Sequence, residues 1–393
     1  MNRQALQTLW LRSVLGLGLL PLLGTRASTM FVETDLVSNV LGLAAQFDPN
    51  LVNPWGLAYS ATSPFWVADN GTGVSTLYDG VGVPQGLVVT VPPPGGGQPP
   101  SKPTGIVFNG GAGFEVEPAK AARFIFATED GTISGWNPAA NPTQAILKVD
   151  NSASGAIYKG LAIDGAQQNI YAANFHAGTI EAYSSSGFAP AALPGNFTDP
   201  ALPAGFAPFN VQSLNGTLYV TYAKQDGAQE DDEAGPGNGY VNRFDLDGNF
   251  LGRLISQGPL NSPWGLAIAP SSFGTFAGDL LVGNFGDGRI NAFDPITGVF
   301  SGSLEVSGGN PIEIPGLRAL MPGNGGNGGL TGNIYFTAGI NGEQDGLFGQ
   351  LAPAVPEVSA LRPVALGSAA VLALSLWRRS RTRRSNRVYL LSP

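Results

Sequence analysis

The chain has 393 residues, of which 56 are glycine, 31 are proline, 12% are charged and none is cysteine. A hydrophobic share of 43% excludes a disordered chain, and the lack of cysteine excludes a disulfide framework, a thiolate metal site and a cysteine nucleophile. Residues 28–355 hold 27 acidic and 10 basic residues, and a body of that charge repels phosphate backbones, so we expect no nucleic-acid binding.

The first 27 residues have the pattern of a secretory signal peptide. Arg3 precedes an apolar run from Val14 to Leu23, and Thr25 and Ala27 supply small residues at the −3 and −1 positions of a cleavage site. A buried first helix is the alternative interpretation, but the run is short and polar, strand-like sequence follows it at once. We therefore expect an exported protein.

A short motif recurs about every fifty residues between 28 and 352. NPWGLA at 53–58 returns as SPWGLA at 262–267, and the shared pattern is a glycine, or a polar residue in its place, followed by an aliphatic residue. The intervals are 49, 55, 50, 55 and 51 residues, between Gly56-Leu57, Gly105-Ile106, Gly160-Leu161, Asn210-Val211, Gly265-Leu266 and Gly316-Leu317. A period near fifty with several short strands in each repeat predicts a β-propeller.

Further apolar runs, rich in aromatic and β-branched residues, follow each copy and predict the other strands of a blade. The third repeat has no clear outer strand near 188–193, and the sixth repeat ends near Leu351 without a fourth strand. The unassigned strand from Met30 to Val37 would complete it. We predict an all-β, six-bladed propeller closed by this N-terminal strand; paired β-sandwiches would not explain the period, and a parallel β-helix would need much shorter repeats.

The loops that enter the first strand and leave the second strand of each blade should meet at one mouth of the central channel. Several of their Asn-Gly and Asp-Gly pairs are ordinary turn formers. The turns alone do not explain why polar and charged groups converge there, together with the only histidine of the chain. We take as candidate ligand-binding residues Asp69, Asn70, Glu129, Asp130, Lys159, Asn174, His176, Asn284 and Asp287.

Oxygen-bearing side chains of this kind suit a hard cation such as Ca²⁺, and the candidate metal ligands are Glu129, Asn174 and Asn284. The run Glu230-Asp231-Asp232-Glu233 lies in a glycine-rich insertion of the fourth repeat, where we expect a solvated loop, with calcium binding as the alternative. No Ser-His-Asp order or paired-carboxylate motif is recognisable.

Residues 353–393 have the pattern of a sorting tail. Val355, Pro356 and Glu357 form a sorting cue, and an apolar segment follows from 363 to 377. Six arginines between 362 and 384 flank that segment. As a helix, fifteen residues span about 22 Å, short of a bilayer core of about 30 Å. The tail resembles the PEP-CTERM signals that bacterial exosortases recognise, although Val358 replaces the second proline; a plain tail anchor is the alternative. We expect a short transmembrane helix before processing, with the body outside the inner membrane.

Longer motifs carry a resemblance over about residues 32–352. DPNLVNPWGLA (48–58), FIFATEDGTISGW (124–136) and LLVGNFGDGRINAFDP (280–295) resemble a family of exported bacterial six-bladed propellers, some with PEP-CTERM tails. Arg318 departs from the family pattern, which has tryptophan. More remotely, the chain resembles NHL-repeat and gluconolactonase-like propellers, and the latter resemblance implies a divalent cation in the channel.

Two functions from different classes fit these observations. The first is a monomeric cell-surface or extracellular-matrix binding protein, which an exosortase-type enzyme would process from the inner membrane and whose partner would be an exopolysaccharide or a surface protein. The second is a Ca²⁺-dependent, lactonase-like hydrolase in which Asp130 or Asp287 would act as base. Electron-transfer or quinoprotein chemistry lacks the histidine and cysteine groups that it normally uses.

Overall fold

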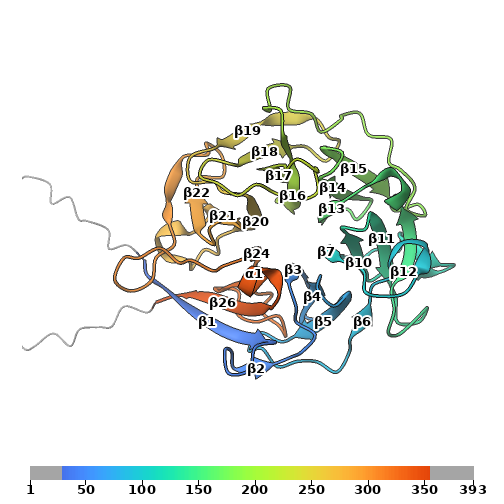
Figure 1. Ribbon diagram of the computed structural model, residues 1–393, viewed down its shortest axis with the longest axis horizontal. Helices are drawn as coiled ribbons and strands as arrows, with labels where there is room; N and C mark the ends of the chain where they lie inside the picture. Colours follow the sequence, from blue (N-terminus) through green and yellow to red (C-terminus); the bar gives the residue numbers. More distant parts are fainter. Residues whose placement is uncertain (1–28, 355–393) are drawn as a thin grey trace, which may run out of the picture. The chain divides into compact units, whose positions relative to one another are not determined.

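Six sheets surround a central channel in the computed structural model, which describes residues 29–354. Figure 1 shows the sheets as blades, with one strand of each blade innermost. These inner strands are β3 (Pro54–Ala58), β7 (Pro103–Phe108), β13 (Tyr158–Ile163), β16 (Phe206–Leu214), β20 (Pro263–Ile268) and β24 (Leu317–Pro322). The prediction of an all-β, six-bladed propeller is confirmed.

The second and third strands of every blade follow in antiparallel order, as the alternating apolar runs predict. The second strands are β4 (Phe65–Asp69), β10 (Phe124–Thr128), β14 (Asn169–Asn174), β17 (Thr217–Lys224), β21 (Leu280–Asn284) and β25 (Ile334–Ala338). The third strands are β5 (Val74–Tyr78), β11 (Thr132–Trp136), β15 (Thr179–Ser184), β18 (Tyr240–Phe244), β22 (Ile290–Phe293) and β26 (Leu347–Pro353).

The outer edge of the propeller is less regular. Outer strands form in four blades as β6 (Val89–Thr90), β12 (Ile146–Asp150), β19 (Phe250–Ser256) and β23 (Phe300–Ser303). Blade three is a sheet of three strands, and only an isolated bridge between Tyr183 and Pro190 stands where its outer strand would be. Small additions are the hairpin β8 (Glu115–Glu117) and β9 (Lys120–Ala121) and the turn α1 (Ile340–Glu343).

The ring is closed by β1 (Phe31–Ser38), which pairs antiparallel with β26 from Phe31↔Pro353 to Ser38↔Leu347 (Figure 1). A short fifth strand, β2 (Gln46–Phe47), then pairs parallel to β1, and the sequence did not indicate it. Closure by the N-terminal strand is therefore confirmed. The signal peptide, the sorting cue Val355-Pro356-Glu357 and the apolar segment lie outside the described residues; within 29–354 no helix is long and apolar enough to cross a membrane.

The hydrophobic core lies between neighbouring blades, because each sheet buries both of its faces against the next sheet. Between blades one and two, for example, the Trp66 and Phe124 rings stack with centroids 4.0 Å apart, and Trp136 packs on Trp66 at 4.8 Å. This arrangement explains why successive strands read as runs of apolar residues and not as a strict alternation of apolar and polar residues.

The repeated tryptophan motif has a steric reason. Asn53 and Ser262, the residues before Pro-Trp, both adopt left-handed backbone, with φ of 45° and 46°. A Cβ on Gly56 would lie 2.5 Å from the Thr104 carbonyl oxygen, and one on Gly265 would lie 2.6 Å from the Arg318 carbonyl oxygen. Glycine is needed here because adjacent inner strands approach more closely than any side chain permits.

One detail of the predicted repeat was wrong. In blades one and five, Leu57 and Leu266 pair with the middle residues of their second strands, Val67 and Val282. In blade six the residue in that position is Leu320, which pairs with Phe336. Gly316-Leu317 therefore lies three residues before the true repeat position, because the sixth copy has alanine where the motif has glycine.

Candidate functional site: the channel mouth

Every inner strand contains one residue more than its partner strand at the same place, near the channel mouth. A β-bulge of this kind re-aims the side chain of the extra residue. The residues at the bulges are Trp55, Thr104, Lys159, Phe209, Trp264 and Arg318. Thr104 donates to the Tyr158 carbonyl oxygen of the next blade at 2.6 Å, and the other five residues contact one another at the centre of the ring.

Aromatic rings plug the channel at this level. Trp55 lies edge-on to Trp264, with centroids 6.0 Å apart, and 6.4 Å from Phe209. The indole nitrogen of Trp264 donates to the Lys159 carbonyl oxygen at 3.0 Å, which ties blade five to blade three across the ring. The tryptophans of the repeated motif are thus packing residues at the mouth; the indole nitrogen of Trp264 links two blades, whereas that of Trp55 has no hydrogen-bond partner among residues 29–354.

Arg318 is the most buried cation of the mouth, with 1% of its surface exposed. Its guanidinium carbon lies 3.6 Å from the centroid of Trp55 and 3.5 Å from that of Phe285, so the group is held between two ring faces. Nη2 donates to Glu343 Oε1 at 2.6 Å. Stacking suits a planar guanidinium, which stays charged even when it is buried.

Lys159 is the second buried cation, and two carboxylates meet it. Nζ lies 2.5 Å from Glu129 Oε1 and 2.9 Å from Asp231 Oδ1, and 5.3 Å from the centroid of Trp55. Burial by itself lowers the pKa of Lys159, but the charges of Glu129 and Asp231 outweigh it and raise the pKa above the usual value. Lys159 is therefore a cation at neutral pH and is unsuited to act as a base.

These groups form one chain of hydrogen bonds, here called the mouth network. It runs from blade six through blades one, two and three to the insertion of blade four. In order, the links are Arg318 Nη2 to Glu343 Oε1 at 2.6 Å, Asn53 Nδ2 to Glu343 Oε2 at 3.1 Å, Asn53 Nδ2 to Asn70 Oδ1 at 3.3 Å, Asn70 Nδ2 to Glu129 Oε2 at 2.8 Å, Lys159 Nζ to Glu129 Oε1 at 2.5 Å and Lys159 Nζ to Asp231 Oδ1 at 2.9 Å. Such a network holds its members in fixed positions.

The acidic insertion is part of this site; most of it is solvated, as expected, but Asp232 is half-buried and Asp231 pairs with a buried cation. Asp231 is three-quarters exposed but reaches the buried Lys159. Asp232 is half-buried, and burial raises the pKa of its carboxyl, while the nearby charges of Arg318 and Lys159 oppose the rise. Glu230 remains exposed, and Glu233 pairs with Lys224.

Of the nine candidate residues, the structure joins Asn70, Glu129 and Lys159 in the mouth network. Asp69 is fully buried and accepts from the Thr76 nitrogen and hydroxyl at 3.0 and 2.8 Å, so it belongs to its own hairpin, and burial raises its pKa well above the usual value. Asp130 accepts from the Lys102 nitrogen at 2.6 Å. His176 is half-buried, with Nδ1 unpartnered among residues 29–354.

The other candidates are bonded within their own blades. Asn174 donates to Glu181 at 2.7 Å, and Asn284 donates to the Pro259 carbonyl oxygen at 2.8 Å and to Asp287 at 3.0 Å. No hydrogen bond of the described chain links the proposed calcium ligands Glu129, Asn174 and Asn284 to one another. Residues 29–354 also hold no group of three or more His, Cys, Asp or Glu side chains arranged to bind a metal ion.

The mouth residues that were not among the nine sequence candidates are Arg318, Glu343, Asp231 and Asp232, although the sequence singled out Arg318 as a departure and the acidic run as an alternative calcium site. Arg318 could have been found by shifting the sixth repeat by three residues, because it then aligns with Trp55 and Trp264. Glu343 gave no signal in the sequence, since it reaches the mouth from the irregular turn α1, where its own φ is 66°. Left-handed backbone at a residue with a side chain costs energy and is frequent at functional sites.

The fold and the mouth network define a closed six-bladed β-propeller with a rigid, charged mouth. The chain is 35% identical over 339 residues to Uncharacterized protein L690 of Acanthamoeba polyphaga mimivirus, which covers 83% of this chain and 87% of that protein. Uncharacterized protein R648 of the same virus is 35% identical over 337 residues, with 83% and 81% covered. The chain belongs to the family of these proteins, and no protein-family model matches it. The resemblance to exported bacterial propellers stays a prediction.

Solved structures resemble the chain only in fold. Streptogramin B lyase is 9% identical, with a TM-score of 0.48 over 82% of this chain and 97% of that chain. The structure of a nidogen/laminin complex contains a chain that is 13% identical, with a TM-score of 0.46 over 72% of this chain and 96% of that chain. Neither similarity carries an argument about activity.

Proposed function

We propose that this protein is an exported binding protein, which holds a hydroxyl-rich ligand such as an exopolysaccharide, or a surface protein that carries one, at the mouth of its propeller. One observation supports the proposal above the others. Nε and Nη1 of Arg318 are buried and lack a hydrogen-bond partner among residues 29–354; so does Oδ2 of Asp232 by geometry, although burial raises the pKa of that carboxyl and the nearby Ser262 hydroxyl lowers it. A buried polar atom without a partner costs about 1–3 kcal/mol, so a ligand that bonds to it gains affinity.

The chemistry of these atoms indicates the ligand. Arg318 offers only donors, and Asp232 offers only acceptors when it is ionised, so a ligand that uses both groups must accept and donate. A hydroxyl group does both, and a sugar carries several hydroxyl groups. Asp231 and Glu343, whose side chains are 76% and 37% exposed, would contact the ligand at the rim. The network around them fixes their positions before binding, which lowers the entropic cost.

The lactonase-like alternative finds no comparable support. Both oxygens of Glu129 are occupied by Lys159 and Asn70, and the proposed base Asp130 accepts from a backbone nitrogen. A cation at Glu129 would have to displace the buried Lys159.

A glycan array tests the binding function. We expect the purified chain to bind one class of glycan, and Asp232→Asn to weaken that binding at least tenfold. Glu230→Gln is the matched control, because it removes an exposed charge from the same insertion without touching the network. The proposal would be contradicted if the chain binds no glycan and no surface glycoprotein. It would also be contradicted if the same preparation cleaves lactones in a calcium-dependent way.

Export and sorting are a second part of the proposal, and they rest on residues 1–27 and 353–393 of the sequence. An alkaline phosphatase fused after residue 354 should be active in cells only when Val14 to Leu23 are present. Phosphatase activity that persists without that run would show that these residues do not direct export.

A further inference from the structure

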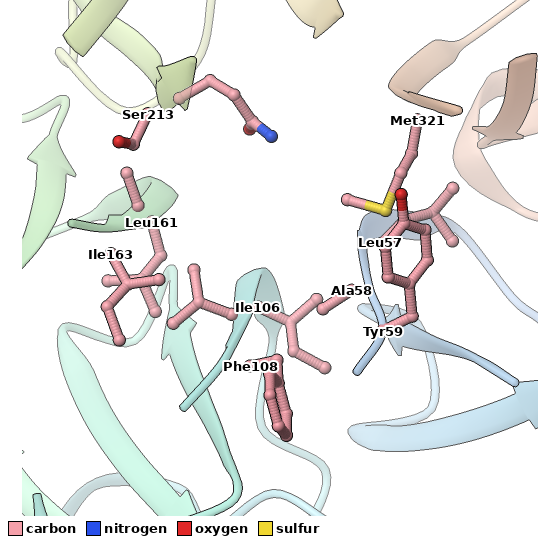
Figure 2. A pocket seen from close by; sticks show the side chains of 12 residues that line it. Leu57, Ala58, Tyr59, Ile106, Phe108, Leu161, Ile163, Ser213 and Met321 are labelled. Atoms are coloured by element: carbon pink, nitrogen blue, oxygen red, sulfur yellow. The ribbon is translucent and has the colours of Figure 1, made fainter. Parts of the chain in front are cut away.

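The channel has a second end, where the inner strands finish, and a pocket opens there. Figure 2 shows its walls, formed by side chains from the inner strands of blades one, two, three, four and six. The mouth network lies at the end of the channel where these strands begin, and the pocket lies at their last residues. It is lined by Leu57, Ala58, Tyr59, Ile106, Val107, Phe108, Leu161, Ala162, Ile163, Gln212, Ser213 and Met321.

The size of the pocket limits its ligand. Its volume is about 200 Å³, and a second space of about 20 Å³ continues inward between Leu57, Ile106, Leu161 and Met321 to Trp264. An apolar cavity of about 150 Å³ holds one benzene molecule, and drug-sized ligands need about 300–1,000 Å³. The pocket therefore fits a molecule with a single ring, or an alkyl chain of similar size. The aromatic plug, which includes Trp264, blocks longer molecules.

The walls contain no acidic or basic side chain. Leu57, Ile106 and Leu161 are each 4% exposed and form the apolar interior. A charged ligand would lose its water here without gaining a partner, which is strongly unfavourable. An uncharged, mainly apolar ligand instead gains from burial, at about 25 cal/mol for each Å² of apolar surface.

Apart from Tyr59, the polar side chains of the pocket come from one strand. Gln212 and Ser213, both from β16, are half-buried in the pocket wall, and Ser213 lies across the cavity from Met321 in Figure 2. The Tyr59 hydroxyl on the opposite rim donates to the Pro322 carbonyl oxygen at 2.8 Å, so its proton is already used. A ligand is therefore oriented by one hydrogen-bonding group that faces β16, while the flexible thioether of Met321 adapts to its apolar body.

From these observations we propose that this pocket, the channel pocket, is a second binding site, for an uncharged molecule with one ring or a short alkyl chain and a single hydroxyl or amide group. The proposal is independent of the glycan-binding function, because the two sites share no side chain and differ in charge.

The methionine methyl groups give a direct test. Within residues 29–354 the chain has only Met30 and Met321, and only Met321 lines the pocket. Methyl-labelled methionine in the full chain is titrated with benzyl alcohol and, separately, with benzoate, which has the same ring and a charge. We expect benzyl alcohol to shift the Met321 signal in a saturable way and to leave Met30 in place, and we expect benzoate to bind at least tenfold more weakly. Met321→Leu assigns the signal.

Two variants separate the site from a general effect on folding. Ser213→Trp fills the pocket from its rim and should weaken benzyl alcohol binding at least tenfold, whereas Ser184→Trp, a half-buried serine on β15 outside the pocket, should not change it. Asp232→Asn should also leave this binding unchanged, even if it abolishes glycan binding. Equal binding of benzoate and benzyl alcohol, no saturable shift of Met321, or full binding by Ser213→Trp would each overturn the proposal.

Discussion

The two ends of the channel are built from the same strands but have opposite chemistry. At the mouth, bulges turn Lys159 and Arg318 inward, and carboxylates from three loops neutralise them. At the other end, only a few residues further along these strands, the channel pocket has no charged side chain. In this repeat fold, therefore, the inner strand determines where a side chain lies. The residue present in each copy determines whether that position is charged or apolar.

Energetics separate the two ends as well. The mouth network combines buried charges, and the cost of removing them from water is offset only while every partner is present. The channel pocket depends on apolar contacts that tolerate replacement by residues of similar size. Replacing one residue should therefore lower stability more at the mouth than in the pocket.

The largest loss of stability is expected at Gly56, on which both ends of the channel depend. Gly56→Ala places a methyl group 2.5 Å from the Thr104 carbonyl oxygen, so the inner strands of blades one and two must separate. We expect a loss of about 3 kcal/mol in the free energy of unfolding, measured by urea denaturation. Gly86→Ala is the matched control, because no atom lies within 4 Å of its new Cβ. Equal stability of the two variants would show that the close approach is not needed.

A smaller effect, confined to the mouth, is expected from Arg318→Ala. The change empties the space between Trp55 and Phe285 and leaves Glu343 without its cation. Because Glu343 is partly exposed, we expect a loss of about 2 kcal/mol in the free energy of unfolding, which is less than for a fully buried pair. Arg318→Met keeps most of the packing and should lose less. Binding of benzyl alcohol should survive in both variants, and its loss would mean that the two ends are coupled.

The smallest effect is expected from calcium. Because Glu129 is already neutralised by Lys159, we expect millimolar Ca²⁺ or a chelator to shift the melting temperature of the purified chain by less than about 1 °C. Magnesium serves as the control for a general effect of divalent salt. A rise of several degrees in the melting temperature with Ca²⁺ alone would show that the chain binds this cation and would favour the lactonase-like alternative.

Most of the fold could be predicted from the sequence, because each blade repeats one pattern of short apolar runs. The tryptophan motif, the six inner strands and the closing strand from Met30 to Val37 were all recognisable. The sequence showed no clear outer strand in blade three, and none forms there, but the motif of blade six was placed three residues early because alanine replaces the expected glycine. That error arises where one copy departs from the repeat.

Much less of the site could be predicted. Asn70, Glu129 and Lys159 were expected at the mouth and lie in its network, but Asn174, Asn284 and Asp287 are bonded within their own blades. Turn residues and binding residues use the same side chains, and only the hydrogen-bond partner distinguishes them. That partner comes from a distant part of the chain, as when Asp231 meets Lys159, 72 residues away.

The sequence by itself determined the architecture of this protein, because the period of its apolar runs and the glycines between them permit little else. The tertiary structure decided the chemistry of the channel. It placed Arg318 between two aromatic rings, brought the acidic insertion over Lys159 and left the far end of the channel uncharged. The physical reason is that strand period is a local property, whereas charge pairing and burial depend on which blades become neighbours when the ring closes.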